Sequence, residues 1–186
     1  MDGIKIALTS YARAGKDTVG KYLCEHYNFR RFAFADEMKR YAYDIFGEPS
    51  DGKKPRELLQ WFGETMRQRD EKVWVRKMFD SIGRYGREWK LPFNVVVTDL
   101  RLPVEYEALK AEGFVFIRVN ANTGARLERM TAERDSFNIE DLTHETESHI
   151  DLFPVNYDIY NDGGFVGLYY QIDYVMADIL AKRRAK

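Results

Sequence analysis

The chain has 186 residues and a formal net charge of −1, with 29 Lys and Arg against 30 Asp and Glu. This charge balance argues against a protein that binds duplex nucleic acid, and the length suits one domain, residues 1–186. One cysteine, Cys24, excludes a disulfide framework and suits a small buried side chain in a reducing compartment. The apolar runs are shorter than the ~18 residues of a spanning helix, and the sequence begins without a signal-peptide pattern. We therefore expect a soluble, cytoplasmic protein without membrane or nucleic acid polymer partners.

Strands and helices alternate along the predicted chain. Residues 95–97 form a continuous valine run, which is typical of a central strand in a parallel sheet covered on both faces. The alternation predicts an α/β fold of three layers, with a five-stranded, mostly parallel sheet and helices on both faces. The predicted strands are 5–9, 31–35, 94–98, 115–119 and 157–160, and the predicted helices are 16–26, 36–47, one from 55, one from 71, 103–113 and one ending near 181.

Two segments depart from this simple alternation. The helices within about 36–90 separate the second strand from the third, so they form either a substrate-covering insertion or a structural decoration. The polar segment of about 122–149 has no clean apolar stripe, and we expect it to be mobile and to face the cleft. Within it, His144 is more typical of a cap or lid contact than of a metal ligand, because no ligand spacing surrounds it.

The first strand is followed by a turn that resembles a phosphate-binding loop. Gly15 and Lys16 occupy the second glycine and the lysine of the G-x-x-x-x-G-K-[ST] pattern, whereas Ser10 replaces the first glycine and Asp17 precedes Thr18. A turn of this kind directs backbone N–H groups and a helix N-terminus at an anion. Lys16 is the expected β/γ-phosphate ligand, with Arg13 beside it, and the Thr18 hydroxyl is a candidate Mg²⁺ ligand, directly or through water. The alternative is an ordinary strand–turn–helix, with Asp17 or Thr18 as N-cap and a solvated Lys16.

Asp99 and Arg101 follow the valine-rich strand. Ligands bind at the carboxyl ends of strands in open α/β sheets, and an arginine there can bind a phosphate with two parallel hydrogen bonds. The alternative is a surface ion pair that caps the next helix.

Cations and aromatic rings recur along the predicted insertion. Such a cluster can bind a nucleotide, with rings on the base and cations on the phosphate. The alternative is an amphipathic helix pair with solvated arginines and core tryptophans. The cluster consists of Arg56, Gln60, Trp61, Arg67, Trp74 and Arg76.

Taken together, these motifs resemble the phage-type deoxynucleoside monophosphate kinases, a branch of the P-loop kinases. The resemblance spans nearly the whole chain, although Ser10, Ala12 and Glu64 depart from the family pattern. The blocks that carry it are 13–18 (RAGKDT), 34–39 (FADEMK), 56–63 (RELLQWFG), 74–75 (WV), 98–101 (TDLR) with Glu105, 141–147 (DLTHETE) and 161–163 (NDG).

The resemblance implies two sets of binding residues. It implies a lid from Arg126 to Arg134, with Arg129 on ATP, and it implies that Asn161 lies near adenine. The remaining implied ATP ligands are Arg13, Ala14, Gly15, Lys16, Asp17 and Thr18. The implied acceptor ligands are Lys39, Arg56, Gln60, Gly63, Trp74, Asp99, Arg101 and Glu105, and the implied catalytic residues are Lys16, Arg13, Asp99 and Arg101.

The expected activity is transfer of the γ-phosphoryl group of ATP, with Mg²⁺, to a (deoxy)nucleoside monophosphate without a covalent intermediate. The alternatives are a kinase resembling dephospho-coenzyme A kinase or phosphomevalonate kinase, and a regulatory module that binds ATP without transferring phosphate. The protein is expected to be a monomer or a homodimer.

Overall fold

The computed structural model describes residues 3–50, 54–89, 92–132 and 149–185. A five-stranded sheet lies at its centre, in the order β2-β3-β1-β4-β5, and all of these pairings are parallel. This confirms the predicted five-stranded α/β sheet. The strands are β1 (Lys5–Thr9), β2 (Phe29–Phe32), β3 (Asn94–Leu100), β4 (Val115–Asn120) and β5 (Tyr157–Tyr160).

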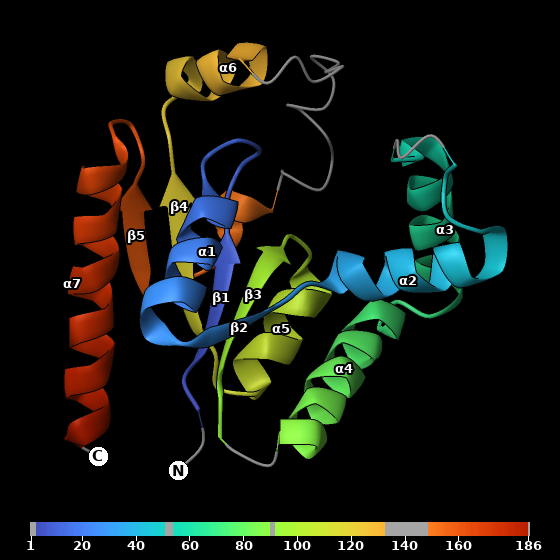
Figure 1. The fold of residues 1–186 in the computed structure, drawn as a ribbon, viewed down its shortest axis with the longest axis horizontal. Coiled ribbons are helices and arrows are strands. Elements are labelled where there is room, and N and C mark those ends of the chain that lie inside the picture. The colour runs from blue at the N-terminus through green and yellow to red at the C-terminus, as the bar shows by residue number, and fades with distance from the viewer. Residues whose placement is uncertain (1–2, 51–53, 90–91, 133–148, 186) are drawn as a thin grey trace.

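Helices cover both faces of the sheet (Figure 1). Side chains alternate along β1, so that Ile6 and Leu8 pack against α1 (Lys16–Tyr27) and α7 (Phe165–Arg184). Ala7 points to the other face, into the core formed with α4 (Val73–Trp89) and α5 (Pro103–Ala111). The sequence reads as continuous apolar runs in the inner strands because both faces are buried in this way.

The remaining helices lie outside these layers. α2 (Phe34–Phe46) and α3 (Arg56–Arg69) extend beyond the sheet on the side opposite α7, whereas α6 (Thr123–Ala132) lies above the ends of β1 and β4 (Figure 1). A short 3₁₀ turn, η3 (Ile150–Leu152), precedes β5. The predicted insertion thus corresponds to α2–α4. The predicted lid begins with α6, while residues 133–148, which include Arg134 and His144, lie outside the described part of the chain.

The predicted second strand, 31–35, is wrong in its limits. α1 ends at Tyr27 because Asn28 takes the left-handed conformation (φ 55°), and β2 then starts at once with Phe29. The strand also ends early because α2 begins at Phe34. The carboxylate of Asp99, a residue of β3, accepts hydrogen bonds from the N–H groups of Phe34 (3.0 Å) and Ala35 (2.9 Å). Asp99 therefore caps the N-terminus of α2.

A buried carboxylate joins α2 to α4. Glu37 on α2 accepts hydrogen bonds from Arg40 (2.8 Å) and from Arg84 of α4 (3.1 Å). Burial opposes its ionisation, but the hydrogen bonds from Arg40 and Ser81 and the charge of Arg84 outweigh this effect and lower the pKa of Glu37. A buried charge is tolerated here because it is paired on two sides, so α2 and α4 are held together by more than apolar contact.

Two expectations from composition concern the described residues. Cys24 is a free, half-buried cysteine in α1, and burial raises the pKa of its thiol. Across the described ranges, the helices include none that combines the length and apolarity needed to cross a membrane.

Candidate functional site

The loop between β1 and α1 turns sharply at two residues. Arg13 has φ 62° and Gly15 has φ 103°, both in the left-handed region, whereas Ser10 has no positive φ. A serine is therefore tolerated at position 10, because the backbone there does not require glycine. The residues of this loop that require a positive φ are instead Arg13 and Gly15.

The N-terminus of α1 faces this loop without a side-chain cap. Gly15 is the N-cap, so the alternative in which Asp17 or Thr18 caps the helix is wrong. The first N–H groups of a helix, here those of Gly15 to Thr18, have no partner within it, which makes them suitable for an anion. The Lys16 side chain is 19% exposed and its Nζ lies 3.1 Å from an oxygen of the exposed Asp17. Lys16 is thus mostly buried beside the helix N-terminus rather than solvated.

Residues from α6 and from the end of β5 hold the loop in place. Asn161 Nδ2 donates to the carbonyl of Ala14 (2.9 Å), and this contact is buried. Arg129 donates to the carbonyls of Arg13 (3.1 Å) and Asn161 (2.6 Å). Two of the residues implied to contact ATP, Arg129 and Asn161, are therefore bonded to the backbone of the loop itself.

A cavity of about 450 Å³ begins at Lys16 and Asp17 and extends under α2 and α4. Six cationic side chains and four carboxylates line it, whereas the whole chain carries a charge of −1. The local excess of positive charge suits an anionic ligand. The lining residues are Lys16, Asp17, Arg31, Ala33, Phe34, Ala35, Asp36, Met38, Lys39, Lys54, Arg67, Trp74, Thr98, Asp99, Arg101, Leu102 and Glu105.

The structure separates the implied acceptor residues into two groups. Lys39, Trp74, Asp99, Arg101 and Glu105 line the cavity. Arg56, Gln60 and Gly63 are not among its lining residues: Gln60 points to Glu64 (3.4 Å), and Gly63 is buried in α3.

Two tryptophans of the predicted cluster also differ in whether they line the cavity. Trp74 is buried, and its indole N–H donates to the carbonyl of Gly63 (3.1 Å). Trp61 is 54% exposed and packs against Phe46 outside the cavity, while Arg76 pairs with Asp70. Of these two tryptophans, Trp74 is therefore the one that a ligand in the cavity can contact.

Four charged residues of the cavity lining are not among the ligands that the resemblance implies: Arg31, Asp36, Lys54 and Arg67. Arg31 pairs with Asp36 (2.6 Å), and both lie beside Lys54 and Arg67 in the lining. Asp36 belongs to the block 34–39 and Arg67 to the cationic cluster, so a sequence motif included each of these two residues. The sequence offers no comparable signal for Arg31 or Lys54, because their placement depends on how α2 and α3 meet the sheet.

Two carboxyl groups lie at the floor of the cavity. Glu105 accepts hydrogen bonds from the N–H groups of Arg101 (2.9 Å) and Leu102 (3.0 Å), which caps the start of α5. Burial, and then the neighbouring Asp99, raise the pKa of Glu105 to about 8. Burial also raises the pKa of Asp99. The two carboxylates therefore serve as helix caps, and Asp99 biases Glu105 toward the protonated form.

Two buried hydroxyls lack a partner among the described residues. Thr98 Oγ1, in the cavity lining, and Ser10 Oγ, in the loop, accept or donate no hydrogen bond. Such orphaned groups beside a helix N-terminus suit phosphate oxygens or water. The described part of the chain has no group of three potential metal-ligating side chains. A Mg²⁺ ion bound mainly by phosphate oxygens and water needs no such group of side chains. Thr18 lies in the first turn of α1.

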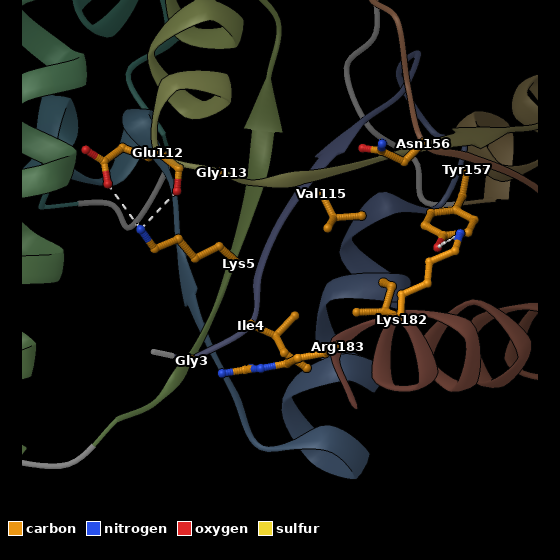
Figure 2. Close-up of a pocket in the computed structure, with 11 residues that line it drawn as sticks. Gly3, Ile4, Lys5, Glu112, Gly113, Val115, Asn156, Tyr157, Lys182 and Arg183 are labelled. Atoms are coloured by element: carbon orange, nitrogen blue, oxygen red, sulfur yellow. Dashed lines mark hydrogen bonds and ion pairs between the residues drawn. The ribbon is translucent and has the colours of Figure 1, made fainter. Parts of the chain in front are cut away.

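A second cavity, of about 500 Å³, lies at the opposite edge of the sheet and includes Lys5 and Lys182 (Figure 2). Lys5 donates to the Glu112 carbonyl (3.0 Å) and pairs with its carboxylate (3.1 Å), and Lys182 pairs with Asp178 (2.7 Å). Its two lysines are thus already neutralised by carboxylates. It lies at the amino ends of the strands, away from the loop, so the cavity at Lys16 is the candidate site.

A sheet covered on both faces, a phosphate-type loop before α1 and a cavity at the strand ends are features of the P-loop kinase fold, and solved structures confirm this fold. TT1252 from Thermus thermophilus is 16% identical over 96% of this chain and 98% of its own, with a TM-score of 0.61. Shikimate kinase from Acinetobacter baumannii, in complex with shikimate, is 16% identical over 97% and 94%, with a TM-score of 0.54. Dephospho-CoA kinase from Campylobacter jejuni is 15% identical over 94% and 96%, with a TM-score of 0.54.

Sequence comparisons give less information about the protein than the structural comparisons do. No family model matches the chain. The uncharacterized protein ORF77 of Ictalurid herpesvirus 1 (strain Auburn) is 28% identical over 134 residues, which cover 70% of this chain and 58% of that protein. The chain thus spans little more than half the length of this curated relative.

Proposed function

We propose that the protein is an ATP- and Mg²⁺-dependent kinase whose acceptor is a (deoxy)nucleoside monophosphate. The observation that carries this proposal is the continuity of the cavity, which starts at Lys16 of the loop and ends under the α2–α4 insertion. Its volume of about 450 Å³ falls within the size of small-ligand sites. A donor phosphate on the loop and an acceptor in the cavity would thus be adjacent.

On the donor side, the N–H groups of Gly15 to Thr18 and the Lys16 ammonium bind the phosphates of ATP in this proposal. Positively charged groups fixed beside the transferring phosphoryl group stabilise the charge of the transition state without covalent chemistry. Thr18 would hold the magnesium ion, directly or through water, and the ion would supply further charge neutralisation. Arg129 and Asn161 support this arrangement indirectly, because they fix the carbonyls of Arg13 and Ala14.

On the acceptor side, Arg101, Arg67 and Lys39 bind the monophosphate, and Trp74 contacts the base by the part of its ring that lines the cavity. Asp99 has a different role from direct contact with metal or substrate. Both of its oxygens accept N–H groups of α2, so it fixes the wall of the acceptor site.

The test is a coupled ADP-release assay with all common nucleoside and deoxynucleoside monophosphates. We expect ADP production that depends on at least one of them, and a loss of about 100-fold or more in kcat/KM for Lys16→Ala. The matched control is Lys21→Ala, five residues along α1, whose side chain is 74% exposed and pairs weakly with Glu25. It should retain wild-type turnover.

Further arms of the assay address the other acceptors. Shikimate, dephospho-coenzyme A and phosphomevalonate are offered in parallel, since kinases for the first two share this fold. Turnover with one of these and none with nucleotides would show that the protein is a kinase but that its acceptor is not a nucleoside monophosphate. ATP binding by calorimetry without turnover on any acceptor would instead identify a regulatory module.

A further inference from the structure

The face of α7 that points away from the sheet is apolar. Val166, Tyr170 and Tyr174 are 83%, 75% and 71% exposed, and Ala177 and Ala181 are also exposed. Their spacing of three to four residues places them along one side of the helix. We call these five residues the outer stripe: Val166, Tyr170, Tyr174, Ala177 and Ala181.

The opposite side of α7 is apolar as well. Leu168, Ile172, Val175, Met176 and Ile179 are buried against the sheet. A surface helix normally exposes charged side chains, and a helix that is apolar all round is normally covered on both sides. α7 instead forms one flank of the molecule (Figure 1). The outer stripe therefore has the character of a contact surface.

A charge beside the outer stripe is turned away from it. The carboxylate of Asp173 accepts hydrogen bonds from Tyr22 (3.0 Å) and Tyr27 (2.8 Å). Tyr22 also stacks on Tyr169, with ring centroids 4.3 Å apart. These contacts fix Asp173 toward α1, so its charge does not interrupt the outer stripe.

We propose that the outer stripe binds a second copy of this chain, with the two α7 helices antiparallel across a twofold axis between residues 173 and 174. This axis places position 166 opposite 181 and position 170 opposite 177. The large side chains Val166 and Tyr170 of each copy thus meet the small side chains Ala181 and Ala177 of the other. A twofold contact requires this kind of self-complementarity, since one surface serves both partners.

Charge supports the same arrangement. In it, Arg184 at the end of one α7 faces the start of α7 in the other copy, and the exposed Asp162 precedes that start in the chain. The antiparallel arrangement also pairs opposite ends of the two helix dipoles. A parallel arrangement would instead bring the three basic residues 182–184 of both copies together.

The size of the outer stripe sets the expected affinity of the dimer. Its apolar side chains span about 22 Å of helix. With aromatic side chains that can each bury 150–250 Å², the contact covers on the order of 1,000 Å² in total, which is at the low end of specific interfaces. We therefore expect a dimer that dissociates on dilution in the micromolar range.

Analytical ultracentrifugation across a concentration series tests the surface. The wild-type mass should rise from 21.9 kDa toward twice that value, whereas Tyr170→Lys should stay at 21.9 kDa at every concentration. The matched control is Ile45→Lys on α2, a residue 63% exposed on a different surface, which should dimerise like the wild type. A wild type that stays monomeric, or a Tyr170→Lys protein that still dimerises, would overturn the proposal. Circular dichroism of each variant confirms that it is folded.

A cross-linking experiment tests the register. In a Cys24→Ala background, Tyr170→Cys and Ala177→Cys chains carrying different tags are mixed and treated with a short bis-maleimide. The antiparallel arrangement predicts a cross-linked heterodimer of the two chains and little product from the Tyr170→Cys chain alone. Efficient cross-linking of the Tyr170→Cys chain to itself, without the heterodimer, would refute the register.

Discussion

Replacement of Gly15 by alanine should destabilise the loop by two separable effects. The first is backbone strain, because φ is 103° at this residue, and the second is a clash, because an added Cβ would lie 2.2 Å from Asn161 Nδ2. The strain costs about 1–2 kcal/mol. The clash displaces a buried amide that donates to Ala14 O, and loss of that hydrogen bond costs about 1–3 kcal/mol. We expect Gly15→Ala to lower the free energy of unfolding by about 2–5 kcal/mol.

A second glycine measures the strain alone. Gly113 has φ 74°, and a Cβ added there would meet no heavy atom within 4 Å. Gly113→Ala should therefore cost about 1–2 kcal/mol. The difference between the two variants estimates the effect of the clash with Asn161.

Urea unfolding of Gly15→Ala, Asn161→Ala and the double variant completes the test. Once Asn161 is truncated, Gly15→Ala should cost no more than Gly113→Ala, which gives a coupling of about 1–3 kcal/mol between positions 15 and 161. Free energies that add to within about 0.5 kcal/mol would refute the contact.

Two further predictions concern Glu105 and Trp74. Because the folded pKa of Glu105, about 8, exceeds that of an unfolded glutamate, the folded state binds more protons between these pKa values, and stability should fall as pH rises toward 8. Glu105→Gln should flatten this decline, by up to about 1.4 kcal/mol per pH unit in urea unfolding, and equal slopes would contradict the raised pKa. Trp74→Phe removes the hydrogen bond to Gly63 and leaves a small void, so it should cost about 2 kcal/mol, whereas Trp61→Phe should change stability by less than about 0.5 kcal/mol. Equal effects would mean that the indole N–H contributes nothing.

Local signals predicted the centre of the fold well. The valine run of β3 and the turn ending at Gly15 and Lys16 depend on residues near one another in sequence, and the sheet that they imply is confirmed. The limits of β2 were wrong for a non-local reason. The start of α2 is set by Asp99, which is 65 residues from Phe34, and no pattern around residue 34 records that contact.

The insertion was harder to predict for a similar reason. Helical spacing indicates which residues of α3 share a face, but the direction of that face depends on how α3 meets α2. Arg67 therefore lines the cavity while Gln60 points to Glu64, although both belonged to one cationic and aromatic cluster in the sequence. Whether the residues around the cavity bind a nucleotide stays a prediction, which the acceptor assay tests.

The backbone at Ser10 has a consequence for recognising such loops in other proteins. Since the left-handed conformations fall at Arg13 and Gly15, a glycine at position 10 is dispensable for the shape of this turn. A search that demands both glycines of the phosphate-loop pattern would discard this chain. A pattern that fixes the Gly15–Lys16 pair, leaves position 10 open and requires a preceding buried strand would retain it, and would extend to loops in which strain is carried by a side-chain-bearing residue.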